Sequence, residues 1–194
     1  MEIAVDVFPG IWQRRRVIAQ TVADVIDDAL LVNAACKGDR SAFGQLYGRY
    51  ARMVHGILLA RVPRSEAEDL VQDVFLTAMR RLSTLRDPAA FGAWIAMIAR
   101  NRANDYHRRL PELSELPEEL TAEDPSLLEA AAIFAVIQSL PEAYRETLIL
   151  RLVEGMTGPE IAVRTGLTPA SVRVNLHRGM KQLRERLEGR NAHA

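Results

Sequence analysis

The sequence contains few of the residues that support catalysis, redox chemistry or metal binding. Its 194 residues include one cysteine, which excludes an internal disulfide and a cysteine-cluster metal site. That cysteine, Cys36, lies among Leu and Ala residues, so we expect a buried and inert thiol. The four histidines are scattered along the chain, and no nucleophile accompanies them. We therefore expect no cofactor and no metal, and an enzyme is the least favoured class.

Long apolar runs are also missing. The longest uncharged stretches, such as residues 88–99, are too short to span a bilayer. Three arginines at 14–16 precede an apolar segment, but Asp24 interrupts it too early for a signal peptide. These features favour a cytoplasmic protein.

Aromatic residues make up only 6% of the chain, and alternating β-branched residues are almost absent. Hydrophobic residues reach 48%, which is enough for one or two small cores. The sequence therefore predicts an all-α fold of two small helical domains.

The formal net charge of zero conceals strong segregation. Residues 1–109 hold 16 Lys and Arg against 12 Asp and Glu, and residues 145–194 hold 9 against 5. Residues 110–144 hold eight acids and no Lys, Arg or His. Two basic blocks around an acidic connector are typical of a nucleic-acid-binding protein with a distinctive linker.

The segment 157–187 predicts a helix-turn-helix. Thr157 and Glu160 form a capping box that starts a short helix, and Gly166 suits the left-handed residue that ends it. Thr168 and Pro169 start a second helix almost at once. In such a motif the second helix normally lies in the DNA major groove.

The second helix has an apolar stripe and an opposite polar side. Helical periodicity places Val172, Leu176, Met180, Leu183 and Leu187 inward. Arginine on the other side can pair with guanine, and Ala and Val can contact the thymine methyl. The plainer interpretation is a solvated basic face. This outer side carries Ala170, Ser171, Arg173, Val174, His177, Arg178 and Lys181.

Four helices are expected before the connector: residues 29–37, a helix from about 41, one from about 65 to 82, and one near 89–108. Ser65 and Glu68 predict a capping box for the third. Its apolar positions lie on one side, and the other side carries Asp69, Gln72, Asp73 and Leu76.

Like charges and three prolines, Pro111, Pro117 and Pro125, oppose packing, so we expect residues 110–124 to be extended and mobile. Asp124 and Pro125 cap a helix over about 126–138. Ser139 and Glu142 supply another capping signal, for a helix that ends near Gly155.

Four stretches together carry a resemblance: GDRSAF at 38–43, EDLVQDVF at 68–75, FGAWIAMIARN at 91–101, and SLPE at 139–142 before the helix-turn-helix. Their order and spacing resemble a bacterial extracytoplasmic-function (ECF) sigma factor of the sigma-70 family. The resemblance implies an N-terminal extension of undetermined role (1–27), sigma region 2 (28–109), an acidic linker (110–125), sigma region 4 (126–188) and a tail (189–194).

The resemblance further implies docking of the third helix on the β′ clamp helices of core RNA polymerase, through Asp69, Gln72, Asp73 and Leu76. A simpler role for acids near a helix start is to complement the helix dipole. That role explains Glu68 well, but it explains Gln72 and Asp73 poorly, because they lie deeper in the helix.

Contacts with the melted −10 promoter element are implied for the fourth helix and the loop before it. Reading bases there requires separated strands. By similarity Leu85, Arg86 and Asn101 line a base pocket, with Leu85 where many relatives have an aromatic residue. Arginines nearby would neutralise backbone phosphates: Arg100, Arg102, Arg108 and Arg109.

Duplex −35 DNA would be contacted by the outer face of the second helix of the helix-turn-helix. The family also implies contact with the polymerase β flap, and an anti-sigma factor, often membrane-bound, that holds the protein inactive. The acidic linker either enters polymerase channels or serves as a solubilising tether.

Two other functions remain open from the residues. A stand-alone helix-turn-helix regulator would explain the C-terminal segment, but not the acidic face of the third helix. A sigma mimic that sequesters a partner would not need the basic residues of the reading helix.

Overall fold

The computed structural model describes residues 27–109 and 125–191, and every regular element in these two ranges is helical. The predicted all-α class is confirmed. The expected roles of the N-terminal extension and the acidic linker fall on residues outside the described ranges. The elements are a helical segment at 27–36, α2 (Arg40–Leu59), α3 (Arg64–Arg81), η1 (Leu82–Thr84), η2 (Pro88–Ala90), α4 (Phe91–Arg109), α5 (Pro125–Gln138), α6 (Glu142–Leu152), α7 (Gly158–Thr165) and α8 (Pro169–Asn191).

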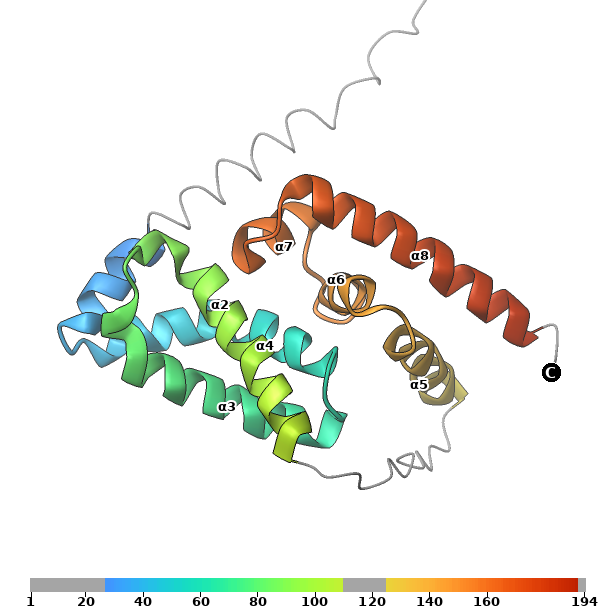
Figure 1. Cartoon of the computed structure of the whole chain (residues 1–194), viewed down its shortest axis with the longest axis horizontal. Helices are drawn as coiled ribbons and strands as arrows, with labels where there is room; N and C mark the ends of the chain where they lie inside the picture. Colours follow the sequence, from blue (N-terminus) through green and yellow to red (C-terminus); the bar gives the residue numbers. More distant parts are fainter. Residues whose placement is uncertain (1–26, 110–124, 192–194) are drawn as a thin grey trace, which may run out of the picture.

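Residues 27–109 form an N-terminal domain and residues 125–191 a C-terminal domain, and the two lie side by side (Figure 1). The first helical segment ends before Gly38, whose φ of 96° is a conformation that glycine adopts easily. Asp39 then caps α2, because its carboxylate accepts hydrogen bonds from the amides of Ser41 (2.8 Å) and Ala42 (3.1 Å).

Two of the predicted capping boxes are wrong. The residue that caps α3 is Pro63, so Ser65 already lies inside the helix and makes no cap. Pro141 likewise precedes α6, and the Ser139 hydroxyl donates instead to the carbonyl of Val136 in α5, at 2.7 Å. In both places an extended proline stands directly before the helix and sets its first residue. Helix α3 therefore starts ahead of Ser65, whereas α6 starts after Ser139.

The predicted inward faces are largely confirmed. All seven apolar positions expected on the inner side of α3 are buried: Ala67, Leu70, Val71, Val74, Phe75, Ala78 and Leu82. In α8, Val172 and Leu183 are buried, whereas Met180 is exposed, contrary to expectation. The neighbouring Gly179 takes the inward position, because a Cβ there would lie 3.1 Å from Leu148 and 3.2 Å from Tyr144.

One other burial expectation fails at the surface of the N-terminal domain. Cys36 is exposed rather than buried, since it is the last helical residue before a turn. Tyr47 of α2 is 41% exposed, although its ring packs against Phe75 with centroids 4.5 Å apart.

The two domains pack directly against one another, which the sequence did not predict. Helix α6 lies against α2, and α7 lies against α4 and α2. The buried apolar residues of both domains form one continuous cluster. The structure thus brings the helix-turn-helix domain onto the surface of the N-terminal bundle.

Candidate nucleic-acid and partner interfaces

The helix-turn-helix forms as the sequence predicts. The Thr157 amide donates to the Glu160 carboxylate at 2.8 Å, and the Glu160 amide donates to the Thr157 hydroxyl at 3.4 Å. Gly166 ends α7 with φ 75°, and α8 begins three residues later. Burial raises the pKa of Glu160, but the hydrogen bonds from Thr157 lower it by more. The pKa of Glu160 therefore lies below its usual value. An ionised carboxylate therefore holds the start of α7.

The outer face of α8 is open to solvent over its first three turns. The Ser171 hydroxyl lies 2.8 Å from that of Thr168, so Ser171 helps to start the helix. Lys181 lies 3.8 Å from Glu185 in a solvent-exposed pair. All seven residues that the sequence placed on this face are exposed: Ala170, Ser171, Arg173, Val174, His177, Arg178 and Lys181. Arginine donors beside small apolar side chains suit the edges of base pairs in a major groove.

A second exposed face lies on α3. Asp69, Gln72 and Leu76 are exposed, with Leu76 at 51%. Asp73 is less free, because its carboxylate forms an ion pair with Arg102 of α4. One turn further, Met79 is 54% exposed and extends the apolar end of this face. Sequence reasoning missed Met79, although its position three residues after Leu76 was the available signal.

The arginines that were expected to meet −10 DNA do not share one surface. Arg100, Asn101 and Arg102 are consecutive in a helix, so their side chains leave it about 100° apart. Arg102 is turned toward α3 and Arg100 toward the C-terminal domain, whereas Asn101 is exposed. Arg108 pairs with Asp105 in its own helix.

Leu85 and Arg86, the two candidate residues in the loop before α4, differ in their exposure to solvent. Leu85 is half-buried and packs against the core, which fits an apolar wall better than a free contact. Arg86 is exposed in this loop, as is Arg109 at the end of α4.

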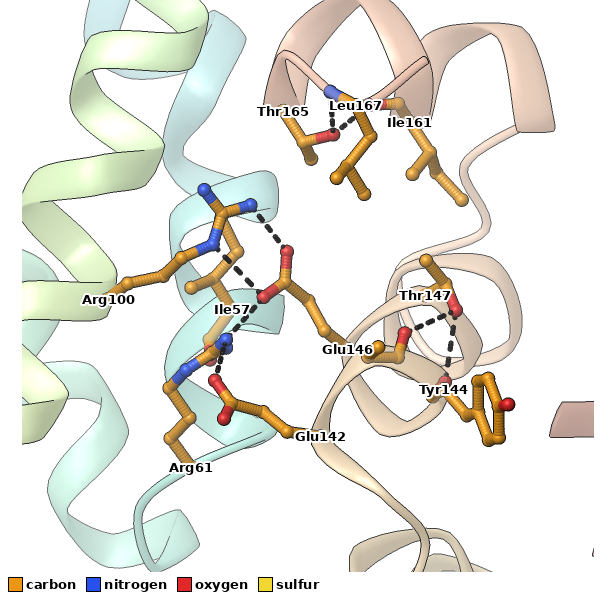
Figure 2. A network of polar contacts seen from close by, with 11 residues as sticks. Ile57, Arg61, Arg100, Glu142, Tyr144, Glu146, Thr147, Ile161, Thr165 and Leu167 are labelled. Atoms are coloured by element: carbon orange, nitrogen blue, oxygen red, sulfur yellow. Dashed lines mark hydrogen bonds and ion pairs between the residues drawn. The ribbon is translucent and has the colours of Figure 1, made fainter. Parts of the chain in front are cut away.

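Arg100 is held by a buried carboxylate from the other domain. Its Nη2 and Nε lie 2.7 and 3.2 Å from the two carboxylate oxygens of Glu146 in α6, and Arg61 Nη2 lies 2.6 Å from the same carboxylate (Figure 2). Burial raises the pKa of Glu146, but the Arg100 and Arg61 guanidinium groups outweigh it, so the pKa is lowered overall. Glu146 is therefore an ionised, buried group shared by two arginines.

The comparisons with known proteins agree with this architecture. The family model of Sigma-70 region 2 matches residues 46–111, and that of Sigma-70 region 4 matches residues 130–183. The chain belongs to the sigma-70 family of RNA polymerase sigma factors. Within that family it is an ECF sigma factor, and thus a transcription initiation factor rather than an enzyme.

The matches to curated relatives span most of this chain and nearly all of each relative. It is 28% identical to the ECF RNA polymerase sigma-E factor of Haemophilus influenzae over 86% of this chain and 98% of the relative. It is 29% identical to that of Escherichia coli strain K12, over 86% and 97%. Among solved structures it resembles CnrH in complex with the cytosolic domain of CnrY, with a TM-score of 0.61 and 26% identity over 84% of this chain and 98% of that one. In the described residues, no helix is both long and apolar enough to cross a membrane.

Proposed function

We propose that this chain directs core RNA polymerase to selected promoters by using each domain for a different target. The N-terminal domain docks on the polymerase through Asp69, Gln72, Asp73 and Leu76, and we add Met79 to that face. The observation that carries the proposal is the presence, on one chain, of an exposed acidic and apolar face on α3 and an exposed arginine-bearing face on a reading helix. A stand-alone DNA-binding regulator has no use for the first face.

In this proposal the C-terminal domain reads the duplex −35 element through α8, and it also meets the polymerase β flap. The N-terminal domain reads the melted −10 element, with Asn101 and the loop of Leu85 and Arg86 nearest to the bases. Arg109 and Arg108 are exposed and suit backbone phosphates. Arg100 becomes available to DNA only when Glu146 releases it.

We also propose a regulatory protein partner of the anti-sigma type. The support is the structural relative, which was solved in complex with the cytosolic domain of CnrY.

The test is to mix the purified chain with bacterial core RNA polymerase and transcribe a library of randomised promoters. Comigration with polymerase and selective transcription are expected, with enriched sequences near −35 and −10. Tight polymerase binding without transcription would instead support a sequestering mimic. Duplex DNA binding without polymerase binding would support a stand-alone regulator.

A further inference from the structure

We infer that the C-terminal domain is an internal inhibitor of −10 recognition: it docks on α2 and α4 of the N-terminal domain and occupies Arg100 with the carboxylate of Glu146. The inhibitory part of this inference rests on the proposed function, because it requires Arg100 to act on promoter DNA. The docking itself does not depend on that role.

Polar contacts hold the docked domains at three places. Glu146 is shared by Arg61 and Arg100, and Arg61 also lies 2.5 Å from Glu142 (Figure 2). Both carboxylates belong to α6, whereas Arg100 lies in α4 and Arg61 in the turn after α2. Buried ion pairs add little net stability, because both charges lose their hydration. They fix the orientation of the docked domain, and the charges regain water when the domains separate.

The second place is Glu154, which follows α6 and is buried. Its carboxylate lies 2.8 Å from His55 Nδ1 and 3.7 Å from Arg52 Nε, and Arg52 also donates to the Glu154 backbone carbonyl. Both partners project from α2 of the N-terminal domain.

The third place is Arg164 of α7. Its Nη1 donates to the backbone carbonyl of Arg49 at 2.8 Å, and its guanidinium lies 5.8 Å from the centre of the Tyr50 ring. The Tyr50 hydroxyl in turn donates to buried Asp28. Three separated anchors therefore define one docked orientation rather than a loose encounter.

Glycines inside two helices let the domains approach closely. A Cβ at Gly56 of α2 would lie 2.8 Å from Leu150 Cδ2 and 2.9 Å from Glu154 Cγ, both in the C-terminal domain. A Cβ at Gly92 of α4 would lie 2.8 Å from the carbonyl oxygen of Arg164. Glycine within a helix costs about 1 kcal/mol relative to alanine. The docked domain hence explains Gly56, whereas a Cβ at Gly92 would also lie 2.9 Å from Tyr50 Cε1 of its own domain.

The docked arrangement cannot read both promoter elements. Elements centred near −35 and −10 are about 25 base pairs apart, or roughly 85 Å of duplex at 3.4 Å per pair. Helix α8 is only about 35 Å long and packs on α6, whose Glu146 touches Arg100. The domains must therefore separate before the two elements are bound together, and separation frees Arg100.

The test measures domain separation in the full-length chain. The exposed Cys36 and a second cysteine introduced at the exposed Arg184 position of α8 (Arg184→Cys) carry a pair of spin labels or fluorophores. Gly56→Leu places a side chain in the domain interface, whereas Gly48→Leu makes the same change in the same helix where a Cβ meets nothing within 4 Å. Circular dichroism confirms that each variant remains helical.

We expect Gly56→Leu to shift the label distances to longer values and Gly48→Leu to match the wild type. Glu146→Gln should also lengthen them, compared with the charge-matched Glu188→Gln on the exposed side of α8. Unchanged distances in both interface variants would overturn the docking.

Inhibition of −10 recognition is tested by measuring the affinity of each variant for a labelled single-stranded oligonucleotide. The oligonucleotide carries the −10 sequence selected in the promoter library. If the docked state holds about 90% of free molecules, its loss should tighten apparent binding about tenfold. Opening without tighter binding would overturn the inhibition and leave the docking intact. If the wild type supports no transcription with core polymerase, the proposed function is wrong, and so is the inhibition that rests on it. The label distances still test whether the two domains dock.

Discussion

Arg102 of α4 forms an ion pair with Asp73 of α3, so a residue expected to neutralise promoter phosphates is held by one expected to bind polymerase. Both side chains are partly exposed, at 26% and 43%. The Nε of Arg102 is buried and makes no hydrogen bond. This geometry makes Arg102 a positioning residue for the Asp73 carboxylate.

Replacing Arg102 by alanine should therefore weaken core polymerase binding more than promoter contact within the assembled holoenzyme. A double-mutant cycle with Asp73→Ala, measured by polymerase titration, should give a coupling of about 0.2–1 kcal/mol, the range for partly exposed pairs. If Arg102→Ala instead weakens the salt dependence of promoter binding and leaves polymerase affinity normal, Arg102 contacts a DNA phosphate.

Gln72→Ala should lower polymerase affinity without affecting folding. The side chain is exposed, so its loss should change the free energy of unfolding by less than about 0.5 kcal/mol. Gln45→Ala, at an exposed site on α2, removes the same group outside the proposed docking face. Polymerase titration of both variants gives the comparison, and equal affinities would remove Gln72 from the interface.

Arg173→Ala and Arg178→Ala should each cost about 1–3 kcal/mol of discrimination at one base pair of the −35 element, if they pair with guanine. Holoenzyme binding to duplexes substituted at single positions measures this. Arg184→Ala, on the same helix but beyond the reading turns, is the control. A loss spread equally over all sequences would identify the arginines as phosphate contacts.

Thr157→Ala should destabilise the C-terminal domain by about 0.5–2 kcal/mol, because it removes the side-chain acceptor that caps α7. Thermal denaturation of the full chain measures the change. Val163→Ala, at an exposed position of the same helix, should have a much smaller effect. Equal shifts in the two variants would show that the cap contributes little.

Acid should open the domain interface. The folded pKa of Glu146 lies below its usual value, so its ionised form favours docking. That contribution is complete above the unfolded pKa of about 4.3 and is lost as the pH falls through the lower folded pKa. Label distances measured between pH 6 and pH 3 should lengthen in the wild type. In Glu146→Gln the domains should already be separated at pH 6. Its label distances should therefore change less between pH 6 and pH 3 than those of the wild type.

The sequence alone determined the local structure wherever a short-range rule applied. The Thr157–Glu160 box, Gly166 and Pro169 fix the helix-turn-helix, since caps and a left-handed residue act within a few positions. The inward stripe of α3 followed from helical periodicity. The same rules failed at Ser65 and Ser139, where a nearby proline decided the helix start.

The tertiary structure decided the hydrogen-bond and ion-pair partners of the charged side chains. No periodicity connects Arg100 with Glu146, 46 residues away, or Arg164 with the carbonyl of Arg49. In the sequence, Gly56 is only a residue that weakens a helix. The structure shows its role, because Leu150 packs against the position where a Cβ would lie. The sequence by itself therefore determined the helices, their caps and their exposed faces. Only the folding of the two domains onto each other decided which of the predicted DNA contacts are free, because that depends on residues far apart in the chain.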